Sequence, residues 1–186
     1  FEYCSQLIEV DTPKLSFAGG LAFRHCVNLE KITASLETIS GSVFFDCQKL
    51  YDIDLSNVKT VGNWGLGQTY ALKSANCPEV TSLGIRAFVS SAIESVYMPK
   101  LKTIAYGAFY NSALKGDVEF PELMSIEQNG GIDTGCFYNT KITKFTAPKL
   151  NVITGDVRAV ERSGILEQCT ELVEVDAPSL TASYRM

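Results

Sequence analysis

The sequence predicts one right-handed solenoid of seven to eight coils, with a parallel sheet of short strands on one side and short turns opposite. Three observations predict this fold class: a repeat of 21–22 residues, a short alternating segment in each repeat, and a proline after most of these segments. The chain has 186 residues, 46 % apolar and 20 % charged, which fits a single domain over residues 1–186. Both ends fall inside a repeat, so we expect a longer parent protein.

A leucine or isoleucine leads each repeat and sets the register of the chain. Successive lead positions are 22, 21, 22, 21, 21, 28 and 30 residues apart. The two long spacings indicate insertions near residues 127–136 and 154–165, which we expect to form loops. The lead positions are Leu7, Leu29, Leu50, Leu72, Ile93, Leu114, Ile142 and Leu172.

Each repeat contains one predicted strand that begins shortly after the lead position. The segment Val96-Tyr97-Met98 has the period of two that is typical of a β-strand. An Ala-Phe pair before the next repeat, as at residues 87–88, is too short for a full helix and predicts a 3₁₀ or helical turn on the convex side. All six prolines follow a predicted strand, where no further backbone donor is needed; they are Pro13, Pro78, Pro99, Pro121, Pro148 and Pro178.

The pattern Ile-Gly-x-x-Ala-Phe-x-x-Cys-x-x-Leu-x-x-Val-x-x-Pro resembles the BspA-like, or Treponema pallidum-type, leucine-rich repeats. Residues 83–88 and 23–29 match it well, and the resemblance covers essentially the whole chain. It implies a leucine-rich-repeat solenoid of the α/β horseshoe type, rich in β-structure. It also implies an extracellular or cell-surface protein of gut or oral bacteria or mucosal protists, several of which are described as adhesins.

The six cysteines have two interpretations. An exported chain with six cysteines could form three disulfides, and the spacing of about 4.8 Å between coils would allow Cys4–Cys26 or Cys26–Cys47. However, Cys26 and Cys47 occupy a repeat position that Thr69 fills elsewhere, and parallel Cβ vectors disfavour a bridge. We therefore predict free thiols that act as small buried side chains.

Composition and motifs argue against several functions. The net charge of −5 does not favour nucleic acid or an anionic membrane, and no apolar run is long enough to insert into a bilayer. His25 is the only histidine and lies in a predicted turn whose residue type varies between repeats, so we expect a solvated side chain. No motif indicates a catalytic residue, a metal site or a cofactor. We therefore expect no enzyme.

The acidic residues are concentrated on the outward positions of the predicted strands, along the concave face. Lys31 is expected between Glu9 and Asp52, and Lys144 between two further acids, which relieves repulsion between strands. The outward pairs carry eight acids and two lysines; they are Glu9/Asp11, Lys31/Thr33, Asp52/Asp54, Ser74/Asn76, Ser95/Tyr97, Asp117/Glu119, Lys144/Thr146 and Glu174/Asp176.

Ser74, Asn76, Ser95 and Tyr97 form a neutral window between two charged parts of this face. An exposed tyrosine among small polar side chains is typical of a recognition surface, although tyrosine is also an ordinary strand residue. The candidate binding residues are this window and the acids beside it, which are Asp52, Asp54, Asp117 and Glu119.

Three further candidates lie outside the strands. Trp64, the only tryptophan, is expected at the surface over the convex side, where it either fills a gap left by glycines or stacks on a ligand. Arg158 and Arg162 lie in the second insertion, which is either a binding loop or a tolerated insertion.

The resemblance favours non-enzymatic binding of a protein or glycan partner, with adhesion to host or neighbouring cells as its biological role. A structural spacer without a ligand is the alternative, since a solenoid suits either role. Carbohydrate or cation binding on the acidic face is less favoured, because acids on a flat sheet do not converge into the cage of oxygens that calcium needs.

Overall fold

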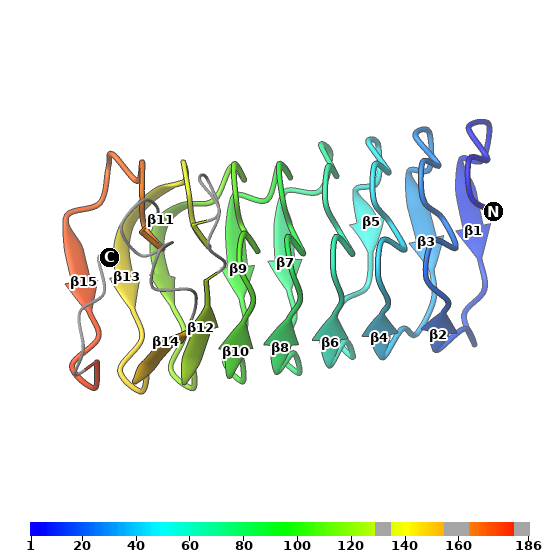
Figure 1. Cartoon of the computed structure of the whole chain (residues 1–186). Helices are drawn as coiled ribbons and strands as arrows, with labels where there is room; N and C mark the ends of the chain where they lie inside the picture. Colours follow the sequence, from blue (N-terminus) through cyan, green and yellow to red (C-terminus); the bar gives the residue numbers. More distant parts are fainter. Residues whose placement is uncertain (129–134, 155–163, 181–186) are drawn as a thin grey trace.

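The computed structural model describes residues 1–128, 135–154 and 164–180, and these form a stack of coils with parallel strands (Figure 1). Most coils contribute two strands. We call the first strand of each coil the first row and the second strand the second row; in Figure 1 they are the upper and lower rows of arrows.

The first row is the predicted sheet. Its strands form three hydrogen-bonded groups, β1-β3-β5, β7-β9 and β11-β13-β15, and all pairs are parallel. The members are β1 (Glu9–Asp11), β3 (Lys31–Thr33), β5 (Asp52–Ile53), β7 (Ser74–Asn76), β9 (Ser95–Tyr97), β11 (Lys115–Glu119), β13 (Lys141–Thr146) and β15 (Glu174–Asp176).

The prediction of one strand per repeat is wrong, because most coils contain a second strand. In the described part of the chain, seven coils return through a further short strand, and these strands pair into one seven-stranded parallel sheet. Most are two residues long, and four of these, such as Thr38–Ile39, have a half-buried or exposed hydroxyl residue followed by a buried aliphatic residue. The members are β2 (Phe17–Ala18), β4 (Thr38–Ile39), β6 (Thr60–Val61), β8 (Ser82–Leu83), β10 (Thr103–Ile104), β12 (Ser125–Glu127) and β14 (Val152–Thr154).

The turns after the second row also differ from the prediction, because the described residues contain no helix there. Two positions in these turns, four residues apart, have a left-handed backbone; for example, Ser42 has φ 57° and Asp46 has φ 61°. This conformation directs their N–H groups to carbonyls of the next coil, with Ser42 donating to Asn63 at 2.8 Å and Asp46 to Gly67 at 3.0 Å. The turns therefore add hydrogen bonds between coils where we expected isolated helical turns.

His25 occupies one of these left-handed positions, with φ 59°. Its ring is half-buried: Nδ1 lies 2.8 Å from Oδ2 of Asp46, and the ring stacks on Tyr3 with centroids 4.7 Å apart. The expectation of a solvated side chain is therefore wrong. Asparagine, aspartate and histidine tolerate the left-handed region better than most residues, which explains the variation in residue type at this position.

The core is a set of aliphatic and aromatic ladders that run from coil to coil. Phe109 is fully buried, and its ring stacks between Phe88 and Phe137 with centroid distances of 5.3 and 5.2 Å. A second stack joins Phe23 to Phe44 at 5.5 Å. Since each ring packs mainly on the rings above and below, every coil depends on its neighbours for burial.

In several coils, a hydroxyl or thiol at one repeat position lies within hydrogen-bond distance of a backbone carbonyl. The Oγ1 of Thr69 donates to the Leu66 carbonyl at 2.9 Å, and the Sγ of Cys47 lies 3.1 Å from the Phe23 carbonyl in the preceding coil. By contrast, the Oγ atoms of Ser91 and Ser112 are buried without a hydrogen-bond partner among the described residues. An unpaired buried hydroxyl costs stability.

We expect Ser112→Ala to raise the free energy of unfolding by about 1 kcal/mol, because it removes an unsatisfied buried hydroxyl. Thr69→Ala is the matched control at the same repeat position. It should lower stability by about 1–2 kcal/mol, since it removes a satisfied hydrogen bond and a methyl group. Urea denaturation followed by circular dichroism measures both; equal losses in the two variants would contradict the assignment.

All six cysteines are free thiols in the structure, and five of them are buried. Burial raises the pKa of the Cys77 thiol to about 12 and also raises the pKa of Cys47, Cys136 and Cys169. Cys4 is the exception to the predicted burial, because it lies in the terminal coil and is exposed.

In the folded protein, we expect only the thiol of Cys4 to react rapidly with Ellman's reagent at pH 8, because it alone is exposed to the reagent. The other five should react only as fast as the protein unfolds. Six reactive thiols per chain in denaturant without reductant is the expected total, and a lower number would reveal a disulfide.

Candidate functional site

The first row presents the predicted neutral window as one continuous surface. Ser74 pairs in register with Ser95, and Asn76 pairs with Tyr97 in the next strand. All four side chains are exposed, and Tyr97 is 59 % exposed, whereas the adjacent Val96 packs on the core and Met98 is buried. The predicted alternation of outward and inward side chains is therefore confirmed, and the Tyr97 ring is exposed on the outer face of the first row.

Lys31 lies between its two predicted acidic neighbours. Its Nζ is 3.7 Å from Oε1 of Glu9 and 3.8 Å from Oδ2 of Asp52. These exposed pairs reduce repulsion along the row and contribute little to stability.

Lys144 only partly follows the prediction. It lies in register between Asp117 and Glu174, but its Nζ bonds to Glu174 at 2.8 Å, which raises the pKa of the lysine. Asp117 instead accepts a hydrogen bond from Oγ1 of Thr143 at 2.7 Å. The pairing of β11 with β13 shifts register between Gly116 and Asp117, where Gly116 has φ 71°. Glu119, at the end of β11, is exposed.

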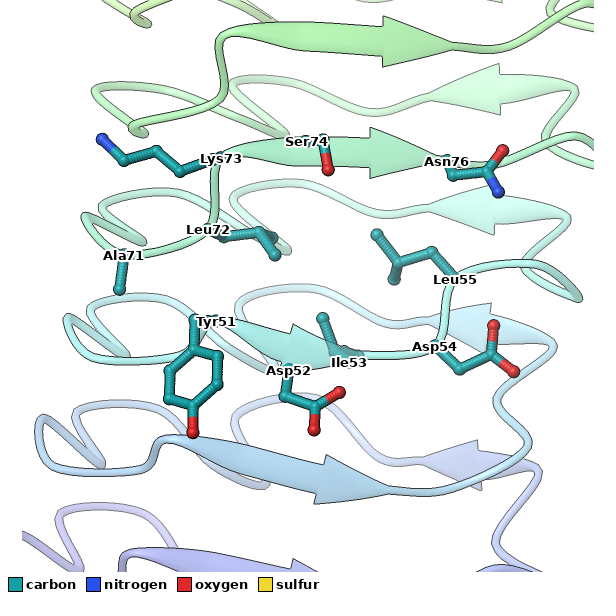
Figure 2. Close-up of a pocket in the computed structure, with 10 residues that line it drawn as sticks. All are labelled: Tyr51, Asp52, Ile53, Asp54, Leu55, Ala71, Leu72, Lys73, Ser74 and Asn76. Carbon is teal, nitrogen blue, oxygen red and sulfur yellow. The ribbon is translucent and has the colours of Figure 1, made fainter.

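The first row is interrupted between β5 and β7 and again between β9 and β11, and the interruption between β5 and β7, which we call the opening, lies at a hollow. β5 pairs with β3 and β7 pairs with β9, but the two do not pair with each other, whereas β6 and β8 below them remain paired. A hollow of about 370 Å³ lies between them. Figure 2 shows that the side chains of Leu55 and Leu72, both buried, lie between the two strands and form its floor.

Two local features account for this opening. Asp54 accepts a hydrogen bond from the Ser56 backbone N–H at 2.9 Å, which ends β5 after Ile53; Ser56 stands where six of the repeats have proline. The turn that leads into the strand also changes. In the first three coils a carbonyl closes this turn, as Cys47 does for the Leu50 N–H at 3.1 Å, whereas the Thr69 carbonyl accepts from Ala92 in the next coil.

Asp52 and Asp54 stand beside the opening, and both are exposed. A second hollow of about 410 Å³ lies on the other side of β5, toward β3, and the same two carboxylates line it. The hydrogen bond from Ser56 holds the pKa of Asp54 below its usual value, so this carboxylate stays ionised at neutral pH. β5 is therefore an acidic ridge between two hollows, which the sequence pattern did not indicate.

Trp64 is half-buried and belongs to a ladder of rings along the turns. Its ring meets the Phe45 ring edge-on at 5.4 Å, and the Arg86 guanidinium lies 5.0 Å from its centroid. Arg86 also lies 5.5 Å from the Tyr110 ring. The tryptophan thus packs within the coil stack and lines a shallow hollow with Phe45 and Arg24. Arg158 and Arg162, and most of both insertions, lie outside the described residues.

Arg86→Ala should lower the free energy of unfolding by about 1–2 kcal/mol, because it removes a cation from two aromatic faces and uncovers the Trp64 ring. Since Trp64 is the only tryptophan, its fluorescence emission should shift to longer wavelength. Lys102→Ala, at an exposed position, serves as the control; an unchanged emission spectrum for Arg86→Ala would contradict the packing.

No group of three or more His, Cys, Asp or Glu side chains that could hold a metal ion occurs within the described ranges. Nor does that part of the chain contain a helix long and apolar enough to cross a membrane.

A stack of two-stranded coils with an exposed first row defines a solenoid repeat protein. The chain belongs to the family described as BspA type leucine rich repeat region, whose sequence profile matches it in six copies over residues 1–91 and 72–163. The resemblance seen in the sequence is thereby confirmed. No curated protein matches the chain.

Two crystal structures resemble the fold. The first is a leucine-rich cell surface protein of Faecalibacterium prausnitzii A2-165, with a TM-score of 0.61 and 13 % identity over 95 % of this chain and 80 % of that one. The second is a leucine-rich repeat protein of Bacteroides ovatus, with a TM-score of 0.42 and 18 % identity over 93 % of this chain and 70 % of that one. The first neighbour agrees with the leucine-rich-repeat fold.

Proposed function

We propose that this chain is a non-enzymatic protein-binding module of a cell-surface or secreted protein, with adhesion to host or neighbouring cells as its role. Its recognition surface is the window of Ser74, Asn76, Ser95 and Tyr97, together with the acidic residues on either side. The observation that carries the proposal is the exposure of Tyr97 on a strand whose backbone is fixed by pairing with β7.

A tyrosine held in this way is suited to recognition. Its ring offers a large apolar area and a hydroxyl, and little conformational entropy is lost when it is covered by a partner. The small polar side chains beside it leave room for close approach, and the charged residues at the edges can select a partner. The leucine-rich-repeat family and the description of the F. prausnitzii protein as a cell surface protein support an extracellular location.

The arrangement around His25 carries no proposal of acyl transfer. Asp46 engages Nδ1 of the ring, as an orienting carboxylate would, but within the described residues no hydroxyl or thiol bonds to the other ring nitrogen. A base without a nucleophile or a bound substrate group cannot perform acyl transfer.

A structural spacer is the alternative, and the charge pairs between coils favour it. Lys59 bonds to Glu37 at 2.8 Å, Lys100 to Glu79 at 2.7 Å, and Lys149 to Glu122 at 2.7 Å, each across neighbouring coils. Charged side chains that already pair with each other across neighbouring coils do not require a partner protein to neutralise them. In that case, substitutions on the first row would have no functional effect.

We expect the module to bind at least one protein among immobilised extracellular-matrix proteins and mucins at physiological salt, with a glycan array tested in parallel. Tyr97→Lys should weaken that binding about 30-fold, as expected for a hot-spot residue. Surface plasmon resonance measures the affinities.

Tyr70→Lys is the matched control, because Tyr70 is also exposed, at 47 %, but lies in the turn before β7. Its affinity should equal that of the unmodified protein. Binding that survives Tyr97→Lys would exclude the window, and the absence of any protein ligand would favour the spacer.

A further inference from the structure

The opening between β5 and β7 offers unpaired backbone groups on both sides. In the described part of the chain, the edge of β5 that faces β7 has no strand partner, and the facing edge of β7 has none either. The neighbouring coils show what is missing: Glu94 donates its N–H to the Lys73 carbonyl at 2.7 Å, and Cys77 donates to the Tyr97 carbonyl at 2.9 Å. Strand edges of this kind accept an extended peptide by backbone hydrogen bonding.

The floor and the rim of the opening differ in character. Leu55 and Leu72 form an apolar floor, while Ser74 and Asn76 supply hydroxyl and amide oxygens on the β7 side. Tyr51, 59 % exposed, also lines the opening. The hollow of about 370 Å³ is at the lower end of the range for ligand sites, about 300–1,000 Å³. It is large enough for one long side chain.

The charge beside the opening is negative and is only partly matched by a cation. Asp54 makes no ion pair among the described residues, and Asp52 shares Lys31, whose Nζ lies 3.8 Å away, with Glu9. Lys73 is the one basic residue that lines the opening, but its Nζ lies 3.5 Å from Glu94, and Figure 2 shows its side chain directed away from the two aspartates. An ionised carboxylate next to an apolar floor favours a cationic side chain with an aliphatic stem.

We propose that this opening receives an arginine side chain from an extended segment of the protein partner. The aliphatic stem packs on Leu55 and Leu72, and the guanidinium donates to Asp54 and to the oxygens of Asn76 and Ser74. The segment's backbone pairs with the open strand edge. Arginine suits the site better than lysine because its planar group has five donors for several separate acceptors and stacks on a tyrosine ring. This inference rests on the proposed function, since it names the chemistry of the partner.

The probe is the peptide acetyl-Thr-Val-Arg-Val-Thr-amide, and its matched control carries citrulline, the neutral isostere, in place of arginine. We expect the whole chain at low salt to bind the arginine peptide at least tenfold more tightly than the citrulline peptide, with lysine intermediate. Titration followed by ¹H–¹⁵N NMR should move the amide signals of residues 51–55 and 74–76 but not those of residues 174–176. Affinity should fall as salt rises.

Asp54→Asn tests the contact without disturbing the fold, because an asparagine Oδ1 can still accept the Ser56 hydrogen bond. It should weaken binding of the arginine peptide at least fivefold. Asp176→Asn, the same charge change at the corresponding position of β15, should leave it unchanged. The proposal is overturned if the citrulline peptide binds equally well, if both variants have the same effect, or if no binding occurs at millimolar peptide.

The outcome separates this inference from the proposed function. Tyr97 does not line the opening, so Tyr97→Lys should leave peptide binding intact while weakening binding of the protein partner. A protein ligand that depends on Tyr97, found together with no arginine preference, would overturn the inference and retain the binding module. A neutral glycan that competes at residues 51–55 would overturn the arginine assignment.

Discussion

Hydrogen bonding from one coil to the next is the constraint on which this structure depends. Among the described residues, backbone bonds within a coil close only its turns, as between the Leu50 N–H and the Cys47 carbonyl, whereas its strands pair with strands of neighbouring coils. The second row, most of the first row and the left-handed turns all bond to a neighbouring coil: the turns donate to the following coil, as Ser42 does to Asn63, whereas Gly62 after the second row donates to Ile39 in the preceding coil. Apolar side chains follow the same rule, since the Phe109 ring stacks on the rings of Phe88 and Phe137 in the coils on either side. Stability is consequently a sum over neighbouring coils, and each coil tolerates changes that leave its two interfaces intact.

The repeat positions that satisfy the backbone also define the family pattern. Cysteine, threonine and serine alternate at one site because each is small and can reach a carbonyl, as Cys47 and Thr69 do. The left-handed sites select a different set, and Asp46 and His25 are examples. A single repeat sequence therefore records two kinds of requirement, volume in the core and conformation in the turns. These requirements account for nearly every cysteine without invoking a disulfide or a metal.

The fold was predictable from the sequence because period and register survive in a repeat protein. The lead position Leu50, the inward alternation around Tyr97 and the ion pairs of Lys31 follow directly from spacing. The second row was missed because a two-residue strand such as Thr38–Ile39 is too short for alternation to be recognised. His25 was misplaced because variation in residue type was taken for exposure, although the recurrence of aspartate and asparagine at that position signals a left-handed backbone.

The candidate site was only partly predictable, for a different reason. The window is defined by four side chains, and the repeat register predicts which residues these are. The opening beside it exists because β5 and β7 do not pair. Missing backbone pairing is not associated with a particular residue type, so the sequence pattern does not reveal it. The opening coincides with Ser56 at the proline position and with the change of turn at Thr69. The serine alone does not mark the place, because Ser35 also replaces proline and the strand before it pairs with β5.

The continuous second row beneath an interrupted first row has a mechanical consequence. Bending that widens the gap between β5 and β7 breaks no hydrogen bond between those strands, while the pairing of β6 with β8 keeps the coils joined below. The paired strands of the second row thus form the axis of a hinge. Bending the solenoid there requires less free energy than bending it between the paired strands β1 and β3. A pulling force or a long ligand would be accommodated first at this joint, so the stiffness of the solenoid is set by its least paired interface rather than by its average coil.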